Sequence, residues 1–266
     1  MRNLIIIPCY NEANRLKFDA FQDFLNSHSD YQICFVNDGS KDGTLEQLTS
    51  FGNKNKEQVI VHDMPQNGGK AEAVRGGMNH VLENYEVDTI GFIDADLATG
   101  FDDYKTLVKT LKSDDLKMVV GSRKMETAQN IDRSAFRLFA SWLIGTMINL
   151  IIGLPIKDTQ CGAKVFTPKT AQYLFNRSFM SRWLFDVEMF IRMKNLYQKN
   201  TMNCIREVAV IDWEEVDGSH ITFQDSLKFP KELLEIGYTY NIQPTLSSIM
   251  KPQIPVIKTN PTRQAA

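Results

Sequence analysis

The sequence predicts a single-domain α/β fold in which a mainly parallel sheet is flanked by helices. Within the first 125 residues, short apolar runs rich in β-branched residues alternate with segments of helical periodicity. That alternation is typical of parallel strands whose connecting helices cover both faces of the sheet. The length of 266 residues fits one large α/β domain, and a hydrophobic content of 43% allows a substantial core.

The expected elements of this first part follow one another in a regular order. Strands are predicted at 4–7, 33–36, 59–61, 89–93 and 118–120. Helices are predicted between them at 13–27, 43–51, 70–83 and 102–113. In such a sheet, ligands bind beyond the carboxyl ends of the strands. Functional residues are therefore expected directly after each strand.

Polar or glycine-rich residues do follow every one of these five strands. The segments are Pro8 to Glu12, Asn37 to Thr44, Asn67 to Lys70, Asp94 to Asp96 and Gly121 to Arg123. Because the carboxyl ends of parallel strands meet at one edge of a sheet, we expect these segments to form a single site.

The second half of the chain has a different pattern. Strands are predicted at 160–166 and 203–211, and helices at 186–196 and 224–238. We interpret 1–240 as one domain, with a nucleotide-binding half at 1–125 and an acceptor-binding half at 126–240. The tail, 241–266, is expected to be disordered, because from Lys251 it holds three prolines and few apolar residues.

Charge and cysteine content exclude several function classes. A net charge of −2 and a pI near 6.1 give no electrostatic reason to expect nucleic-acid binding. The four cysteines form no C-x-x-C pair, so zinc-finger and thioredoxin-like sites lack their spacing, and a reduced, cytoplasmic protein is expected. Residues 1–8 have no basic start and no cleavage site, so no secretory signal is expected.

A stretch without charged residues runs from Leu138 to Ile156 and has three interpretations. It could be a buried helix, a helix lying in the membrane surface, or a membrane span. Glycines, Asn149 and Pro155 weaken the span, which would also separate residues that we expect to share one site. Arg133 and Arg137 lie at its start, where guanidinium groups suit phosphate oxygens beside an apolar surface.

The pair Asp94 and Asp96 is the clearest chemical signal. Two carboxylates one residue apart, after a buried strand, can reach a divalent cation together with phosphates. Mg²⁺ or Mn²⁺ is expected there, neutralising the charge that grows on a departing nucleoside diphosphate. An isolated D-x-D can also be a turn rich in aspartate for backbone reasons.

The other strand ends offer weaker candidates. Asp38 could accept hydrogen bonds from a base or ribose, whereas Asp42 is expected to cap a helix. Glu12 could be a first-turn acid or part of the cleft. Lys70, after two glycines at a helix start, could help to receive an anionic group.

Transfer to an acceptor needs a carboxylate that orients it or takes its proton. Asp158, Asp186 and Glu188 are the downstream candidates, and the residues alone do not rank them.

Taken together, these motifs resemble glycosyltransferase family 2, whose GT-A fold carries a D-x-D metal site. Within that family the resemblance is to enzymes that glycosylate dolichyl and other polyprenyl phosphates. The more specific matches lie downstream, at Asp158 to Lys164, at Arg182 to Glu188, and at Trp213 with Gly218 and Ser219. The resemblance covers about 240 residues, all but the tail.

The resemblance implies roles for individual residues. Asp96 would be the principal metal ligand, and Asp158 would act beside the acceptor phosphate. The nucleotide pocket would be lined by Pro8, Tyr10, Glu12, Asp38 and Asp94, and the acceptor phosphate would be bound by Arg123, Arg137 and Ser141.

The implied enzyme is an inverting transferase that moves a sugar, glucose from UDP-glucose, to a polyprenyl phosphate. It would be a peripheral protein on the cytoplasmic face of a membrane, touching it through 135–156. Relatives often carry membrane anchors that we do not expect here, and His220 stands where relatives often place lysine. A family 2 enzyme with a soluble or glycan acceptor is the alternative, and a catalytically idle nucleotide-sugar binding module is a third.

Overall fold

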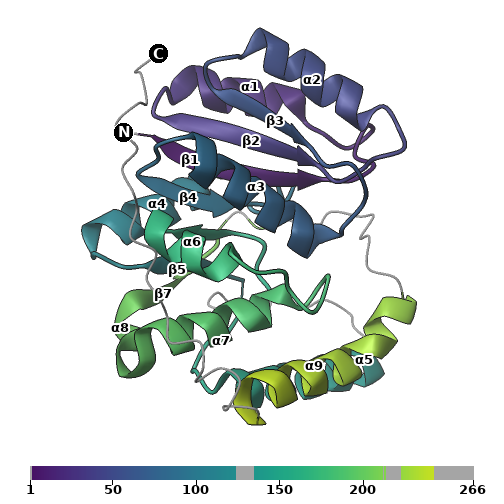
Figure 1. The fold of residues 1–266 in the computed structure, drawn as a ribbon, viewed down its shortest axis with the longest axis vertical. Coiled ribbons are helices and arrows are strands. Elements are labelled where there is room, and N and C mark those ends of the chain that lie inside the picture. The colour runs from purple at the N-terminus through teal and green to yellow at the C-terminus, as the bar shows by residue number, and fades with distance from the viewer. Residues whose placement is uncertain (1, 124–134, 212, 214–222, 243–266) are drawn as a thin grey trace.

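The computed structural model describes residues 2–123, 135–211, 213 and 223–242. Its described strands form one seven-stranded sheet in the order β3-β2-β1-β4-β6-β5-β7 (Figure 1). The strands are β1 (Asn3–Cys9), β2 (Tyr31–Asn37), β3 (Val59–Asp63), β4 (Thr89–Phe92), β5 (Met118–Ser122), β6 (Lys164–Phe166) and β7 (Ile205–Ala209). All pairings are parallel except those of β6, which is antiparallel to both β4 and β5. The predicted mainly parallel sheet is confirmed.

Helices cover both faces of this sheet, as the alternation of elements predicted. The described helices are α1 (Phe18–Ser27), α2 (Thr44–Lys54), α3 (Lys70–Asn84), α4 (Phe101–Ser113), α5 (Ala135–Ile152), α6 (Pro168–Phe175), α7 (Phe185–Tyr197), α8 (Thr201–Cys204) and α9 (Phe223–Gly237). A 3₁₀ turn, η1 (Gln198–Asn200), precedes α8, and a π-helical turn, η2 (Tyr238–Ile242), follows α9.

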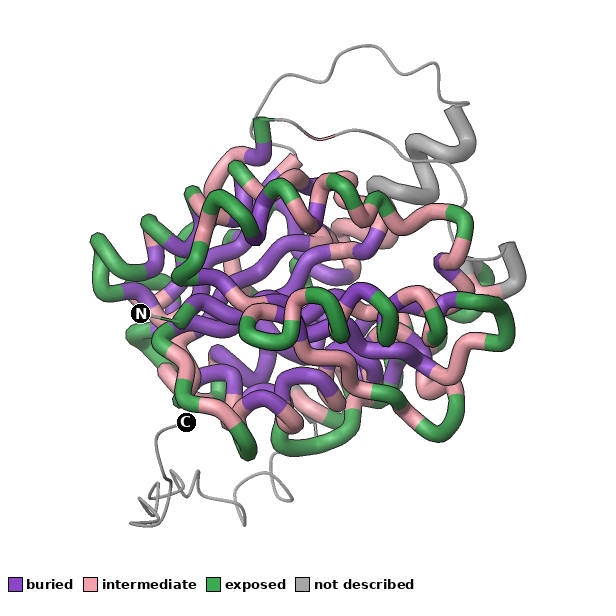
Figure 2. Tube along the Cα trace, turned by 90° about the horizontal axis from the view of Figure 1, so that it is seen from above, coloured by how far each residue is buried: buried purple, intermediate pink, exposed green. Residues whose placement is uncertain are grey.

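Strand β1 shows how the sequence divides the core between the two faces. Leu4 and Ile6 point into a cluster with α3, α6, α7 and the described part of α5 and α9. Ile5 and Ile7 point to the opposite face, into a cluster with α1, α2 and α4. All four side chains are fully buried, which matches a strand that is apolar on both sides. Buried residues fill the middle of the molecule and exposed residues lie mainly at its periphery (Figure 2).

Several predicted boundaries differ from the structure, and local contacts explain why. Helix α1 begins at Phe18 rather than at residue 13, because the amides of Arg15 and Leu16 both donate to the carbonyl of Glu12 and close a turn. Strand β7 begins at Ile205, since 201–204 form α8. Helix α6 was not predicted; Pro168 occupies its first turn, where a missing N–H costs nothing.

Strand β6 is also shorter than the predicted 160–166, because it begins only at Lys164. The residues before it form turns beside the carboxyl end of β4, where Gly162 lies against Asp94.

The apolar stretch forms α5, which ends where Gly153 adopts a φ of +63°. In the described part of this helix, Ile148 and Ile152 are buried while Leu150 is exposed. Helix α5 packs beside α9 at the edge of the molecule farthest from α1 and α2 (Figure 1). None of the described helices combines the length and apolar character that crossing a bilayer requires. The predicted tail lies outside the described residues from 243 onward.

Candidate active site

A cavity of about 690 Å³ opens at the carboxyl ends of the parallel strands. This is the position that the strand-end rule predicts for ligands in an α/β sheet. Its lining includes these predicted residues: Pro8, Tyr10, Glu12, Asp38, Lys70, Asp94, Asp96 and Arg123. Segments more than 100 residues apart in the sequence therefore meet in one site.

The antiparallel strand β6 adds a second set of residues to this edge. Because β6 runs opposite to its neighbours, its amino end lies where theirs have their carboxyl ends. The chain that enters it carries Asp158, Gln160 and Gly162 past the end of β4. A Cβ built on Gly162 would lie 2.2 Å from an Asp94 carboxylate oxygen, so only glycine allows this close approach.

The two carboxylates of the D-x-D pair are partly exposed to the cavity and each lies beside a cation. The Oδ1 atom of Asp94 is 2.5 Å from the Nζ atom of Lys70, and Oδ2 of Asp96 is 3.6 Å from the guanidinium of Arg15. Directly after the pair, the chain turns at Leu97, whose φ of +57° is unusual for a non-glycine residue and whose amide donates to the carbonyl of Asp94 at 3.1 Å. The amide of Ala98 donates to Asp96 at 3.0 Å.

This donor set fits a divalent metal. Mg²⁺ and Mn²⁺ prefer hard oxygen ligands, and Mg²⁺ is usually held by one or two carboxylates together with water and substrate phosphates. In the described part of the chain, no cluster of three or more metal-ligating side chains occurs. The protein would thus supply two carboxylates, and the remaining ligands would come from a phosphorylated substrate and water.

Lys70 stands at the centre of a row of alternating charges. Burial disfavours its ammonium, but the carboxylates of Asp94, Asp186 and Asp96 outweigh burial and raise the pKa of Lys70. Asp186 lines the cavity and in turn pairs at 2.7 Å with Lys164, which is fully buried. Two lysines therefore balance two of the acidic groups in this part of the site.

Asp38 fixes the loop that precedes α3. It is 2% exposed, and its two carboxylate oxygens accept hydrogen bonds from the amides of Gly68 (2.7 Å) and Gly69 (2.8 Å). Burial raises the pKa of Asp38 despite these hydrogen bonds. Gly69 has a φ of +86°, and a Cβ there would collide with the side chain of Arg182. Asp38 thus faces the cavity while holding the glycine turn in place.

The end of β1 is held against the start of α2. The amide of Glu12 donates to the hydroxyl of Thr44 at 2.8 Å, and that hydroxyl donates to Asp42 at 2.5 Å. The N-cap of α2 is Gly43, so the predicted cap, Asp42, lies one residue before the observed cap and accepts the amide of Thr44 instead. These bonds keep Glu12, which is 6% exposed, at the edge of the cavity.

Arg123 and Asp158 form a two-point ion pair. The Nε and Nη2 atoms of Arg123 donate to the two oxygens of Asp158 at 2.8 and 2.9 Å. Burial opposes the charge of Arg123, but the Asp158 carboxylate outweighs it and raises the pKa of the guanidinium. Asp158 is 1% exposed, and its own amide is held by Glu207 at 2.9 Å. Arg123 lines the cavity, and Asp158 lies directly behind it.

The three downstream carboxylates occupy different positions. Asp186 lines the cavity, Asp158 is paired with Arg123, and Glu188 is fully buried beside Arg192. The side chains of Arg137 and Ser141, together with Arg133 and His220, lie outside the described residues.

Sequence reasoning missed several residues of the cavity wall. Arg15 belongs to a segment predicted as helix, and Arg182 and Trp183 had been noted only as part of a downstream match. Helix α9 adds Asp225, Lys228 and Glu232. Its one sequence signal was amphipathic periodicity, which predicts a helix but not the face that meets a site.

Comparisons with known proteins agree with this geometry. A profile described as "Glycosyl transferase family 2" matches residues 4–178. The dolichyl-phosphate beta-glucosyltransferase of Drosophila melanogaster is 36% identical over 252 residues, which are 89% of this chain and 74% of that protein. The protein of the same name from Dictyostelium discoideum is 34% identical over the same shares of both chains.

Solved structures share the fold. Glucosyl-3-phosphoglycerate synthase from Mycobacterium tuberculosis, in complex with Mn²⁺, UDP-glucose and phosphoglyceric acid, matches with a TM-score of 0.62 and 16% identity. The match covers 89% of this chain and 80% of that chain. With the D-x-D pair, the sheet order and the family match in agreement, the chain belongs to glycosyltransferase family 2 and has the GT-A fold.

Proposed function

We propose that this protein transfers a sugar to a polyprenyl-phosphate acceptor with inversion at the anomeric carbon. The proposed donor is UDP-glucose, so the sugar transferred would be glucose. The observation that carries the proposal is the cavity, in which the D-x-D carboxylates, the glycine turn before α3 and Arg123 meet. The named relatives are dolichyl-phosphate beta-glucosyltransferases, which supports this donor and acceptor class.

The donor would lie along the ends of β1, β2 and β4. Pro8, Tyr10, Glu12 and Asp38 line that part of the cavity and would contact the nucleoside. Asp94 and Asp96 would hold Mg²⁺ or Mn²⁺, which supplies positive charge to the departing diphosphate. Lys70, 2.5 Å from Asp94, would add a second cation beside the phosphates.

The acceptor would approach from the side of Arg123. A guanidinium has five N–H donors, and the pair at Nε and Nη2 already binds Asp158. The opposite edge, at Nη1, would bind the acceptor phosphate, together with Arg137 and Ser141 from α5. A phosphate oxygen would attack the anomeric carbon, the bond from that carbon to the diphosphate oxygen would break, and the nucleoside diphosphate would leave with the electron pair.

Asp158 has a defined part in this reaction. The acceptor phosphate is already a nucleophile, so Asp158 need only take its last proton or keep Arg123 in position. The two-point pair between Asp158 and Arg123 supports the second task directly. The apolar segment 135–156 would touch the membrane that holds the lipid acceptor.

The test is a donor panel with Mn²⁺ or Mg²⁺ and a short polyprenyl phosphate, with the released nucleoside diphosphate as the readout. We expect release from UDP-glucose that requires the lipid. Asp96→Ala should lower the rate about 10²- to 10³-fold through lost electrostatic stabilisation. Asp158→Ala should lower it about 10²- to 10⁴-fold, the range for a general base. Asp19→Ala, which changes an exposed carboxylate of α1, is the matched control.

The outcomes separate the alternatives. Donor hydrolysis that does not depend on the lipid would support a glycosyltransferase but contradict a lipid acceptor. Failure to partition onto liposomes, combined with transfer to a water-soluble glycan, would favour a soluble acceptor. Absence of turnover with every nucleotide-sugar would overturn the proposal.

A further inference from the structure

The segment between α6 and α7, residues 176–184, carries Arg182 and Trp183 into the cavity. It contains no helix or strand, so its shape is not fixed by its own backbone hydrogen bonds. Arg182 lies over Gly69 and donates to Asn67 of the glycine turn. The position of this segment therefore shapes the cavity beside the glycine turn, where the donor would lie.

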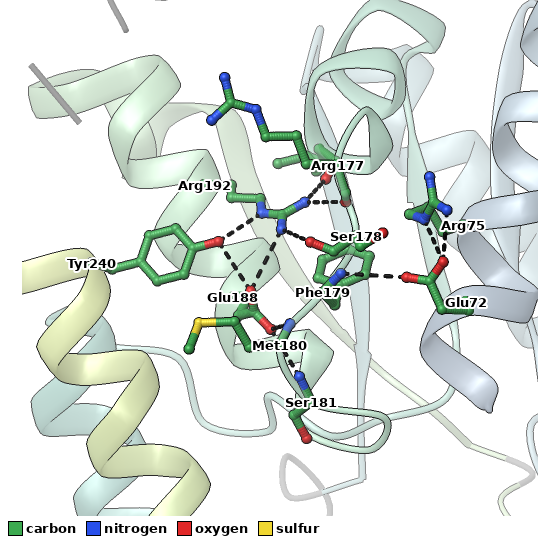
Figure 3. A network of polar contacts seen from close by, with 11 residues as sticks. Glu72, Arg75, Arg177, Ser178, Phe179, Met180, Ser181, Glu188, Arg192 and Tyr240 are labelled. Carbon is green, nitrogen blue, oxygen red and sulfur yellow. Dashed lines mark hydrogen bonds and ion pairs between the residues drawn. The ribbon is translucent and has the colours of Figure 1, made fainter. Parts of the chain in front are cut away.

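The side chain of Arg192, on α7, donates hydrogen bonds to backbone carbonyls at the end of α6 and in this segment (Figure 3). Its Nη1 atom donates to the carbonyls of Leu174 (2.6 Å) and Arg177 (3.0 Å), and Nη2 donates to the carbonyl of Ser178 (2.8 Å). Its guanidinium also lies 4.2 Å from the ring centroid of Phe179. One 7% exposed side chain thus organises the start of the segment.

Glu188, one turn earlier on α7, binds the next part of the segment. Its Oε1 atom accepts the amides of Met180 at 2.7 Å and Ser181 at 3.4 Å, and the residue is 0% exposed. Its Oε2 atom lies 3.5 Å from Arg192. Neither Glu188 nor Arg192 is among the described residues that line the cavity.

Tyr240 connects this buried pair to the C-terminal helix. Its hydroxyl donates to Glu188 at 3.0 Å and accepts from the Nε atom of Arg192 at 3.2 Å (Figure 3). Tyr240 belongs to η2, which continues α9, and α9 supplies cavity-lining residues. A second link joins the same two parts, because the hydroxyl of Ser181 donates to Glu232 at 2.5 Å.

Burying two charges is costly, and such a pair is weak evidence for stability because its desolvation offsets its attraction. A better-supported use of buried ionic groups is to select one arrangement of the chain. Here the pair binds four backbone groups of the 176–184 segment and the carbonyl of Leu174 in α6, and it also binds the hydroxyl of Tyr240, which follows α9. The 176–184 segment and α9 both contribute residues to the wall of the same cavity.

We propose that Glu188, Arg192 and Tyr240 are positioning residues, which hold the 176–184 segment and α9 in the arrangement that binds the nucleotide of the donor. The inference rests on the proposed use of this cavity for a nucleotide-sugar. The three residues act on donor binding and leave the chemical step unchanged, since they lie behind the wall rather than in it.

The test compares two tyrosine variants. Tyr240→Phe keeps the ring and removes the hydroxyl between Glu188 and Arg192. Tyr197→Phe is the matched control: Tyr197 is the last residue of α7, and its hydroxyl forms a hydrogen bond with Thr170 at 2.8 Å, away from the 176–184 segment. Calorimetric titration with UDP, and separately with GDP, in the presence of Mn²⁺ gives the nucleotide Kd.

We expect Tyr240→Phe to raise the Kd roughly three- to tenfold, the usual effect of one lost hydrogen bond. Its kcat at saturating donor should stay within about twofold, and Tyr197→Phe should bind like the wild type. A purely structural role would lower the melting temperature of both variants and leave both Kd values unchanged. Glu188→Gln, which keeps an acceptor for Met180 but removes the charge, should raise the Kd further.

Binding measurements distinguish a failure of the proposed function from a failure of this inference. Wild-type protein that binds neither nucleotide would overturn the proposed function, and this inference with it. Wild-type binding with an unchanged Kd for Tyr240→Phe and Glu188→Gln would overturn the inference alone. Equal losses of affinity in Tyr240→Phe and Tyr197→Phe would also overturn it.

Discussion

Asp94 and Asp96 each meet a cation that comes from a different part of the chain. Lys70 at the start of α3 and Arg15 after β1 form ion pairs with the two carboxylates. Two unpaired carboxylates so close together would repel each other and raise their own free energy. Protein cations therefore offset the negative charge that the residue pattern brings together at this site.

Gly162→Ala tests the packing behind Asp94. The added Cβ would lie 2.2 Å from Oδ2 and 2.7 Å from Cγ of Asp94, so the carboxylate must turn away from Lys70. A misplacement of about 1 Å can cost about 10²-fold in rate, and we expect a loss of this order in transfer assays. Gly100→Ala, where no described atom lies within 4 Å of the new Cβ, is the control. Full activity of Gly162→Ala would contradict this view of the site.

Asp42→Asn tests a pH effect at the start of α2. The slight burial of Asp42 is outweighed by hydrogen bonds from the hydroxyl and amide of Thr44 and from the amide of Ala13, which lower its pKa. A lowered pKa stabilises the fold above the ordinary aspartate value of about 3.9, and the effect is lost as pH falls through the folded-state value. Wild-type protein should thus be more stable than Asp42→Asn at pH 7, and the difference should shrink towards pH 3.

Urea denaturation at several pH values measures that difference. Asp23→Asn, an exposed carboxylate of α1, gives the general effect of losing one negative charge. A gap between wild type and Asp42→Asn that is independent of pH would argue against the ionised side chain as its source.

At the scale of elements, helix α3 determines how the glycine turn reaches the cavity. Its first residue is Lys70, and its inner face packs directly on β1 and β2. Gly77 allows this contact, because a Cβ there would lie 2.6 Å from Val36 and 2.8 Å from Ile6. The close approach of helix and sheet places the N-terminus of α3 over the ends of both strands.

Gly77→Ala and Gly76→Ala form a matched pair on α3. Both gain helix propensity, up to about 1 kcal/mol. Gly77→Ala also overpacks the contact with the sheet, which costs about 1–3 kcal/mol. The Cβ of Gly76→Ala would lie 3.3 Å from the flexible side chain of Met64 and 3.7 Å from His62, so it fits with little displacement. We expect chemical denaturation to show Gly77→Ala destabilised relative to Gly76→Ala, and the reverse order would refute the packing argument.

At the scale of the molecule, the hydrophobic core that stabilises the fold does not include the D-x-D pair. The described core lies on both faces of the sheet, and the carboxylates of the D-x-D pair have protein cations as partners. Metal and nucleotide would bind to a cavity that the chain has already formed. Binding then stabilises the native state by mass action rather than creating it.

Removal of divalent metal with EDTA should therefore abolish transfer while leaving the melting temperature nearly unchanged. Addition of Mn²⁺ and UDP at about 100 times the Kd should stabilise the protein by about 2.7 kcal/mol. For a chain of this size, each kcal/mol raises the melting temperature by about 2–4 °C. Differential scanning fluorimetry measures both effects, and melting that drops sharply in EDTA would mean that a metal is structural.

The sequence by itself determined the strands, most of the helices and the set of polar residues at the strand ends. These features depend on periodicity and turn chemistry within a few residues, as at Leu4 to Ile7 or Asp94 to Asp96. Because parallel strand ends share an edge, the same pattern also predicted that Asp38, Asp94 and Arg123 would meet.

The tertiary structure alone decided how the second half of the chain completes the cavity. The antiparallel insertion of β6 between β4 and β5 sets Gly162 against Asp94, and the pairing of Glu188, Arg192 and Tyr240 sets Arg182 over Gly69. These contacts join residues tens of positions apart, and no local pattern encodes the direction of a strand or the partner of a buried charge. Both depend on the packing of the whole chain, where long-range contacts outweigh local preference.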